Sequence, residues 1–144
     1  MIKGGCGFLF VILIFIIWSY IRWGSVAYGL VWLQGEQLVV EPSSMDLRDV
    51  PCGERKKLSF RVKNLAAEPV HLLGANSSCS CLVTNDLPTI VPANGSCEIH
   101  AEFVVPSEAG KFTKDLVVYS ELESQTYLVV QISGNAVTTE KNKK

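Results

Sequence analysis

The sequence predicts an all-β domain, an antiparallel sandwich of about seven short strands, preceded by one N-terminal transmembrane helix. Three observations lead to this prediction. An apolar stretch without acidic residues occupies the N-terminus. After residue 35, apolar and polar residues alternate in short segments, which is the period-2 pattern of strands with one buried and one exposed face. Turn residues separate these segments about every eight to twelve positions, the spacing typical of a β-sandwich, and no amphipathic helix is found among them.

Residues 1–35 are predicted to form a signal anchor. The run FLFVILIFII at residues 8–17 is wholly apolar, and Lys3 and Arg22 carry the only charges in this segment. A helix needs about 20 apolar residues to cross the hydrocarbon layer, and this segment is long enough. Two interpretations stay open: an uncleaved anchor with Lys3 in the cytoplasm, or a signal peptide cleaved near Ser25-Val26-Ala27. Both place the rest of the chain outside the cytoplasm.

Two alternating segments predict strands most directly. In KLSFRVKN, Leu58, Phe60 and Val62 fall on one face and charged or polar residues on the other; SCEIHAEF at 96–103 behaves in the same way, with Cys97 on the apolar face. Further strands are expected at Gln37–Val40, Val70–Asn76, Thr89–Val91, Lys111–Tyr119 and Tyr127–Ile132. The nearly continuous apolar run in the last of these favours a central strand. The resulting sandwich spans residues 36–137 and is of the immunoglobulin-like type.

The charge distribution excludes one class of partner. All fourteen acidic residues lie from Glu36 onward, together with eleven of the thirteen basic ones, so residues 36–144 carry a net charge of −3. A domain that binds nucleic acid needs a basic face to neutralise phosphates, and none is expected here. The short basic stretch at 138–144 is predicted to be a disordered tail.

The exported part resembles a bacterial family, the domain-of-unknown-function family 1573, whose immunoglobulin-like domains are similar to those of the major sperm protein and PapD. The resemblance covers about residues 54–136 and depends on motifs in a fixed order. These are Phe60-Arg61-Val62-Lys63-Asn64, Pro69-Val70, Ser78-Cys79-Ser80-Cys81, Ile90-Val91-Pro92, Glu102-Phe103, Gly110-Lys111-Phe112 and Val130-Gln131-Ile132-Ser133-Gly134. Ser80 stands where the family usually has glycine. The resemblance implies the sandwich fold and a periplasmic location, with the anchor in the inner (cytoplasmic) membrane as a single-pass segment.

The cysteines allow several kinds of site. Residues i and i+2 of an extended strand lie about 6.6 Å apart, so a Cys79–Cys81 disulfide requires the chain to bend. Cys52 and Cys79 are expected at the same end of neighbouring antiparallel strands, and an oxidising compartment favours a disulfide between Cys52 and either Cys79 or Cys81. A metal site at Cys79 and Cys81, for copper or zinc, is the alternative. Cys97 is expected to be a small buried apolar residue.

No catalytic residues are expected. A nucleophile needs a base within reach and a group that orients the base, and no such set stands out; His71 and His100 are isolated in the sequence and are expected to be surface strand residues. We therefore expect a non-catalytic binding or scaffold domain of the cell envelope, without a cofactor. Its expected partners are the membrane, through the N-terminal helix, and an unidentified envelope protein or peptide. A metal-binding or thiol-redox module centred on Cys79-Ser80-Cys81 is the alternative function.

Overall fold

The computed structural model describes residues 5–24 and 26–138. The chain divides into two compact units between Gln37 and Leu38, and each is described by itself. Lys3, the proposed cleavage position at Ser25 and residues 139–144 of the expected disordered tail lie outside the described residues.

The N-terminal unit contains two helices where one was expected, α1 (Gly5–Trp23) and α2 (Val26–Leu33). The break lies next to Gly24, whose φ of 73° is the left-handed conformation that glycine adopts without steric cost. The helices approach closely where Gly29 faces Ser19, because a Cβ at position 29 would lie 2.1 Å from Ser19 Oγ. No described helix is by itself long and apolar enough to span a membrane; residues 7–22 and α2 reach the required length and composition only as a pair, bent by 104°.

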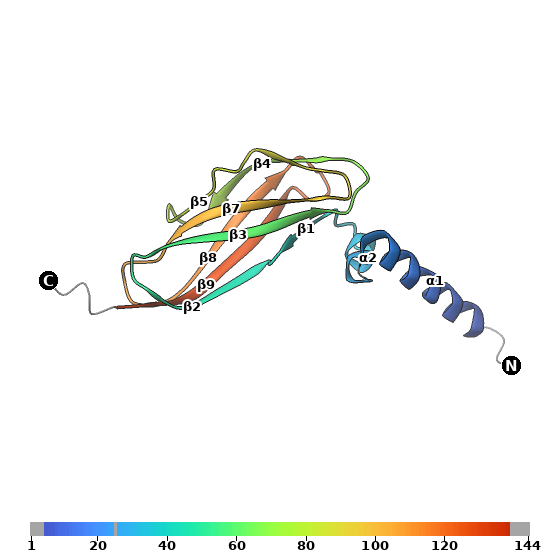
Figure 1. Cartoon of the computed structure of the whole chain (residues 1–144), viewed down its shortest axis with the longest axis horizontal. Coiled ribbons are helices and arrows are strands. Elements are labelled where there is room, and N and C mark those ends of the chain that lie inside the picture. The colour runs from blue at the N-terminus through green and yellow to red at the C-terminus, as the bar shows by residue number, and fades with distance from the viewer. Residues whose placement is uncertain (1–4, 25, 139–144) are drawn as a thin grey trace. The chain divides into compact units, whose positions relative to one another are not determined.

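The second unit is an immunoglobulin-like sandwich of two sheets (Figure 1). The four-stranded sheet has the order β1 (Leu38–Glu41), β3 (Arg55–Asn64), β7 (Ser96–Val104) and β5 (Leu82–Val83). The five-stranded sheet has the order β2 (Ser44–Pro51), β9 (Tyr127–Val137), β8 (Gly110–Ser120), β4 (Val70–Ser77) and β6 (Thr89–Val91). The central position of β9 confirms the prediction made from its apolar run.

The core forms where the inner faces of the sheets meet. Phe60 and Val62 of β3 are buried as the alternation predicted, and Phe103 of β7 stacks on Phe112 of β8 with ring centroids 5.4 Å apart. Asn64 is also buried, yet its amide is satisfied: Nδ2 donates to the carbonyl oxygens of Glu68 (2.7 Å) and Val91 (3.3 Å), and Oδ1 accepts from the Ala66 N–H (2.9 Å). A buried amide without partners would be costly, so these hydrogen bonds are maintained, and they hold the loop that leaves β3 in place.

The structure corrects the strand count and the purely antiparallel arrangement. The described residues contain nine strands, and β2 and β5 were not expected. β2 lies parallel to β9 with an irregularity between Asp46 and Asp49, where Arg48 has a φ of 56° and donates its N–H to Asp46 Oδ1 (2.9 Å). This bulge at a sheet edge interrupts the alternation that would have revealed the strand. β5 is two residues long, too short to show a period.

Candidate functional site

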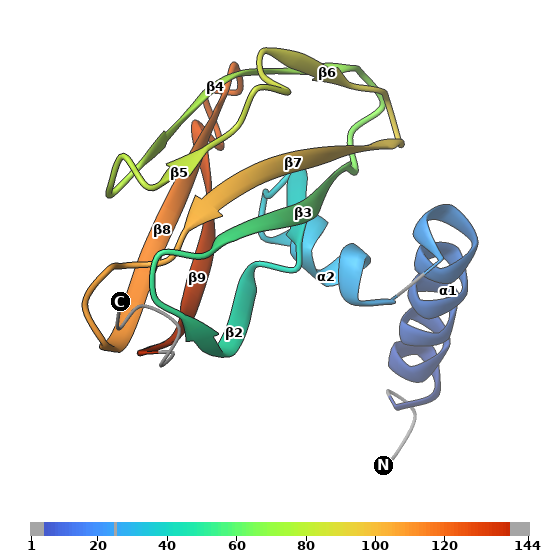
Figure 2. The same cartoon turned by 60° about the vertical axis from the view of Figure 1, so that its left-hand side comes forward.

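Strand β4 (Val70–Ser77) is paired over most of its length on only one side. On that side β8 covers Leu72 to Ser77. On the other side β6 pairs only with Val70, His71 and Leu72. Within the described chain, the stretch Gly74–Ser77 therefore has an edge that no strand covers, beside the short strand β6 (Figure 2).

The backbone groups on this open edge follow from the β4–β8 ladder. The Ser78 N–H donates to the Asp115 carbonyl oxygen of β8 (3.2 Å). Backbone groups of alternate residues in a strand point to opposite sides, so Gly74 and Asn76 direct theirs to β8, as Ser78 does. Ala75 and Ser77 therefore direct their N–H and C=O groups to the open side. An unpaired row of this kind is a template for another strand.

A groove of about 490 Å³ lies against the open edge. One wall is the β4 backbone from Gly74 to Ser77, and the other is formed by β5 and the residues that follow it. The lining residues are Gly74, Ala75, Asn76, Ser77, Cys79, Ser80, Leu82, Val83, Thr84, Leu87 and Leu116. None of them is charged, and the volume falls in the range of about 300–1,000 Å³ that ligand pockets occupy.

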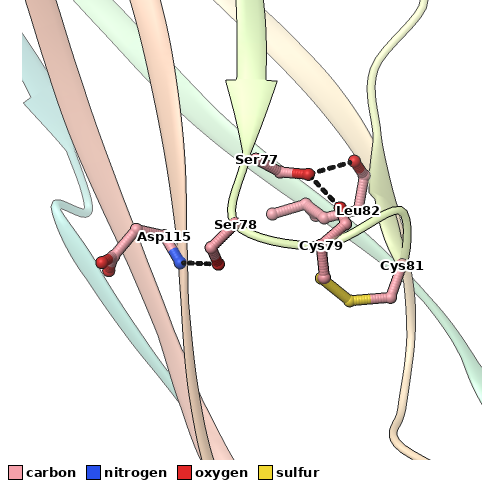
Figure 3. Close-up of a disulfide and its surroundings, with 6 residues drawn as sticks. All are labelled: Ser77, Ser78, Cys79, Cys81, Leu82 and Asp115. Atoms are coloured by element: carbon pink, nitrogen blue, oxygen red, sulfur yellow. Dashed lines mark hydrogen bonds between the residues drawn. A yellow bond between two sulfur atoms is a disulfide. The ribbon is translucent and has the colours of Figure 1, made fainter.

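The turn between β4 and β5 closes one end of the groove and carries a Cys79–Cys81 disulfide (Figure 3). Hydrogen bonds fix this turn on both sides. Ser77 Oγ donates to the carbonyl oxygens of Cys79 and Leu82, the latter at 3.1 Å, and Ser78 Oγ accepts from the Asp115 N–H at 3.3 Å. The Cys81 carbonyl oxygen accepts from the Val104 N–H of β7 at 2.7 Å. The turn is thus attached to both sheets.

The expected disulfide from Cys52 is not present, because Cys79 and Cys81 pair with each other and Cys52 is free. A Cys79–Cys81 disulfide was expected to require a bend in the chain, and the turn provides it by bringing the two Cα atoms to 5.2 Å, within the range for a disulfide. The same pairing leaves no thiolates at Cys79 and Cys81 for copper or zinc, and no group of three or more metal-ligating side chains occurs among the described residues. Cys97 is free and half-buried on β7, and burial raises the pKa of its thiol.

His100 has a partner that its isolation in the sequence did not reveal. Its ring Nδ1 lies 2.9 Å from Asp86 Oδ2, and its backbone N–H donates to the same oxygen at 2.7 Å. This backbone hydrogen bond, with the ring contact, lowers the pKa of the Asp86 carboxyl group. Thr84 Oγ1 donates to the His100 carbonyl oxygen at 2.7 Å. All three contacts join the segment after β5 to β7, which gives the cluster a structural role: it holds one wall of the groove.

Comparisons with known proteins agree with this architecture. Residues 38–136 match the model of a family described as "Protein of unknown function (DUF1573)". Similar solved structures include a PapD-like domain of human CEP192, with 14% identity, a TM-score of 0.55, and coverage of 72% of this chain and 87% of that one. The Vibrio cholerae VesB protease has 16% identity and a TM-score of 0.58, with coverage of 78% of this chain and 36% of that one. The YadV chaperone has 8% identity and a TM-score of 0.54, with coverage of 74% and 55%. No curated protein matches the sequence significantly. At these identities the likeness concerns the fold.

Proposed function

The chain belongs to the DUF1573 family, and on that premise we propose that it is a membrane-anchored extracytoplasmic domain that binds an extended segment of another envelope protein. The segment adds to the sandwich as a strand along Gly74–Ser77 of β4. The observation that carries this proposal is the uncovered half of β4, where the backbone groups of Ala75 and Ser77 face a groove and not a neighbouring strand. Strand addition to a sheet edge obtains its affinity from such main-chain hydrogen bonds.

The groove defines what the bound segment should look like. Side chains of a strand alternate, so every second residue of the segment faces the groove, whose lining includes the half-buried Leu87 and the buried Leu82 and Leu116. The lining carries no charged side chain, which favours small uncharged residues such as valine at these positions, since a charged side chain would lose hydration without gaining a partner. Polar residues fit the intervening, solvent-facing positions. The preferred ligand is therefore an extended segment of alternating apolar and polar residues.

Proline at position 75 tests this proposal. Ala75→Pro removes the N–H that faces the groove and leaves the β8 ladder intact, since proline is tolerated where the strand N–H faces solvent. The assay measures binding of a fluorescein-labelled heptapeptide of alternating valine and serine by fluorescence anisotropy. We expect the variant to bind this peptide about tenfold more weakly. The cause is the loss of one hydrogen bond and its neighbour, which together contribute about 1.4 kcal/mol to the binding free energy. Ala75→Gly, which keeps the N–H, is the matched control. Its affinity for the peptide should stay within about threefold of that of the native chain, a smaller change than the loss of one hydrogen bond would cause. Equal binding by the proline variant, or no saturable binding by the native chain, would refute the proposal.

The membrane part of the proposal is supported by the composition of α1 and α2. Apolar side chains are exposed around α1, for example Ile21 at 78%, and a helix apolar on every side requires an apolar environment. The bent pair meets the length of a span only when both helices are counted. Intact mass of the purified full chain decides between anchor and cleaved signal. A mass that includes Met1, with the protein in the carbonate-resistant membrane fraction, supports an anchor; a chain that starts near Ala27 and is recovered as soluble protein contradicts it.

A further inference from the structure

We propose that the Cys79–Cys81 disulfide is a thiol–disulfide exchange site for a cysteine-bearing strand bound in the groove beside β4. The docking step rests on the proposed function, whereas the chemistry rests on the disulfide itself. The ligand is thus an extended peptide with a cysteine among its groove-facing residues, and the reaction transfers two electrons from peptide thiols to Cys79 and Cys81.

The position of the disulfide relative to the groove carries the first part of the argument. Cys79 and Ser80 line the groove at the end of the open edge, whereas Cys81 does not line it. Both cysteines are half-buried, and Ser80 between them is exposed, so the disulfide lies at the surface. A strand that pairs with Gly74–Ser77 continues directly toward this turn. A peptide sulfur would therefore meet Cys79 before Cys81.

The second part of the argument is that the disulfide contributes little as a staple. It closes a loop of only three residues, and the stabilisation from a disulfide increases with the length of the closed loop. The Ser77 hydroxyl already holds the Cys79 carbonyl, and the Val104 N–H holds the Cys81 carbonyl. These bonds position the backbone of the two residues independently of the sulfur atoms. None of these hydrogen bonds involves a sulfur atom, so we expect the site to keep its shape on reduction, which an exchange reaction requires.

The reaction balances without any further oxidant. A peptide thiolate attacks Cys79 Sγ, the Cys79–Cys81 bond breaks, and the electron pair leaves on Cys81 Sγ, which takes a proton from water. A second peptide thiolate attacks the peptide sulfur of this mixed disulfide, and Cys79 leaves as the thiolate. The net result is one disulfide between two peptide thiols and two reduced cysteines in the domain.

The test compares two thiols on the full chain in detergent. One is a heptapeptide of alternating valine and serine with a central cysteine in place of one valine, and the other is reduced glutathione, which has no strand to add. Opening of the disulfide is followed by maleimide quenching and mass spectrometry. We expect the peptide to open the disulfide at least about tenfold faster than glutathione, because docking to the strand edge through about one hydrogen bond raises the rate by that factor. The mixed disulfide should map to Cys79.

Variants at position 75 separate the two proposals. Ala75→Pro should abolish most of the preference, so that the ratio of the peptide rate to the glutathione rate falls about tenfold, and Ala75→Gly should keep the preference. If the valine–serine heptapeptide binds but the cysteine peptide opens the disulfide no faster than glutathione, the exchange site is refuted and the binding function stands. If neither peptide binds and no rate preference is seen, both are refuted. A mixed disulfide that maps to Cys81 also overturns the proposed assignment.

Discussion

Reduction of the Cys79–Cys81 disulfide should lower the free energy of unfolding of the domain only modestly, because the disulfide closes a loop of three residues. In the chain-entropy account, closing a loop of three residues stabilises the folded state by about 1.6 kcal/mol at 25 °C. A bridge from Cys52 to Cys79 would close a loop of about 28 residues and would contribute about 3.6 kcal/mol by the same relation. The two pairings therefore differ by about 2 kcal/mol, which equilibrium unfolding resolves.

The assay is urea unfolding of the full chain in detergent, followed by far-ultraviolet circular dichroism at a wavelength that reports β structure, with and without a phosphine reductant. We expect a loss of about 1.6 kcal/mol on reduction and an unchanged urea dependence. Cys52→Ser is the matched control and should leave this difference unaltered, because Cys52 is free. A loss of about 3.6 kcal/mol or more, or a difference that disappears in Cys52→Ser, would show that the disulfide is a structural staple with another partner.

Three further predictions concern the sandwich. Phe103→Ala should lower the free energy of unfolding by about 3–5 kcal/mol, because this fully buried ring packs on Phe112. Val104→Ala, on the exposed face of the same strand, is the control and should change the free energy of unfolding by less than about 0.5 kcal/mol. Parallel urea titrations measure both. Asn64→Asp should cost about 1–3 kcal/mol in the same assay, since it removes the buried amide that donates to the Glu68 and Val91 carbonyl oxygens; an unchanged midpoint would contradict this role. The pKa of Asp86 is lowered in the folded state, so its carboxylate stabilises the fold above the unfolded pKa of about 3.9 and loses this effect as the pH falls through the lower folded value. Asp86→Asn should therefore be less stable than the native chain at neutral pH and equally stable in strong acid, and a difference that persists in acid would contradict this assignment.

Long alternating strands could be predicted from the sequence because burial on one face imposes a period of two on several residues. In β3 and β7 this pattern identifies the inward residues, such as Phe60 and Ile99, and both are buried. The same reasoning fails for β2, where a bulge near Arg48 shifts the register, and for β5, which is too short to show a period. The parallel pairing of β2 with β9 depends on where the chain crosses between sheets, which alternation does not encode.

The candidate site could be predicted only in part. Cys79 and Cys81 stand out by their spacing, but their pairing depends on a turn at Ser80, and the sequence showed only that such a turn would be needed. The open edge of β4 depends on the difference in length between β4 and β6, and both strands were expected at nearly their observed bounds. A comparison of those two lengths was the available signal. It could not be used without the sheet order, which places the two strands side by side.

Amide hydrogen exchange along β4 tests the central claim most directly. In the full chain in detergent, the amides of Gly74 and Asn76 should be protected by β8, while those of Ala75 and Ser77 should exchange rapidly because no described strand covers them. Addition of the valine–serine heptapeptide should slow exchange at Ala75 and Ser77 and leave Gly74 and Asn76 nearly unchanged. Strong protection of Ala75 and Ser77 without peptide, or no change when the peptide is added, would contradict strand addition at this edge.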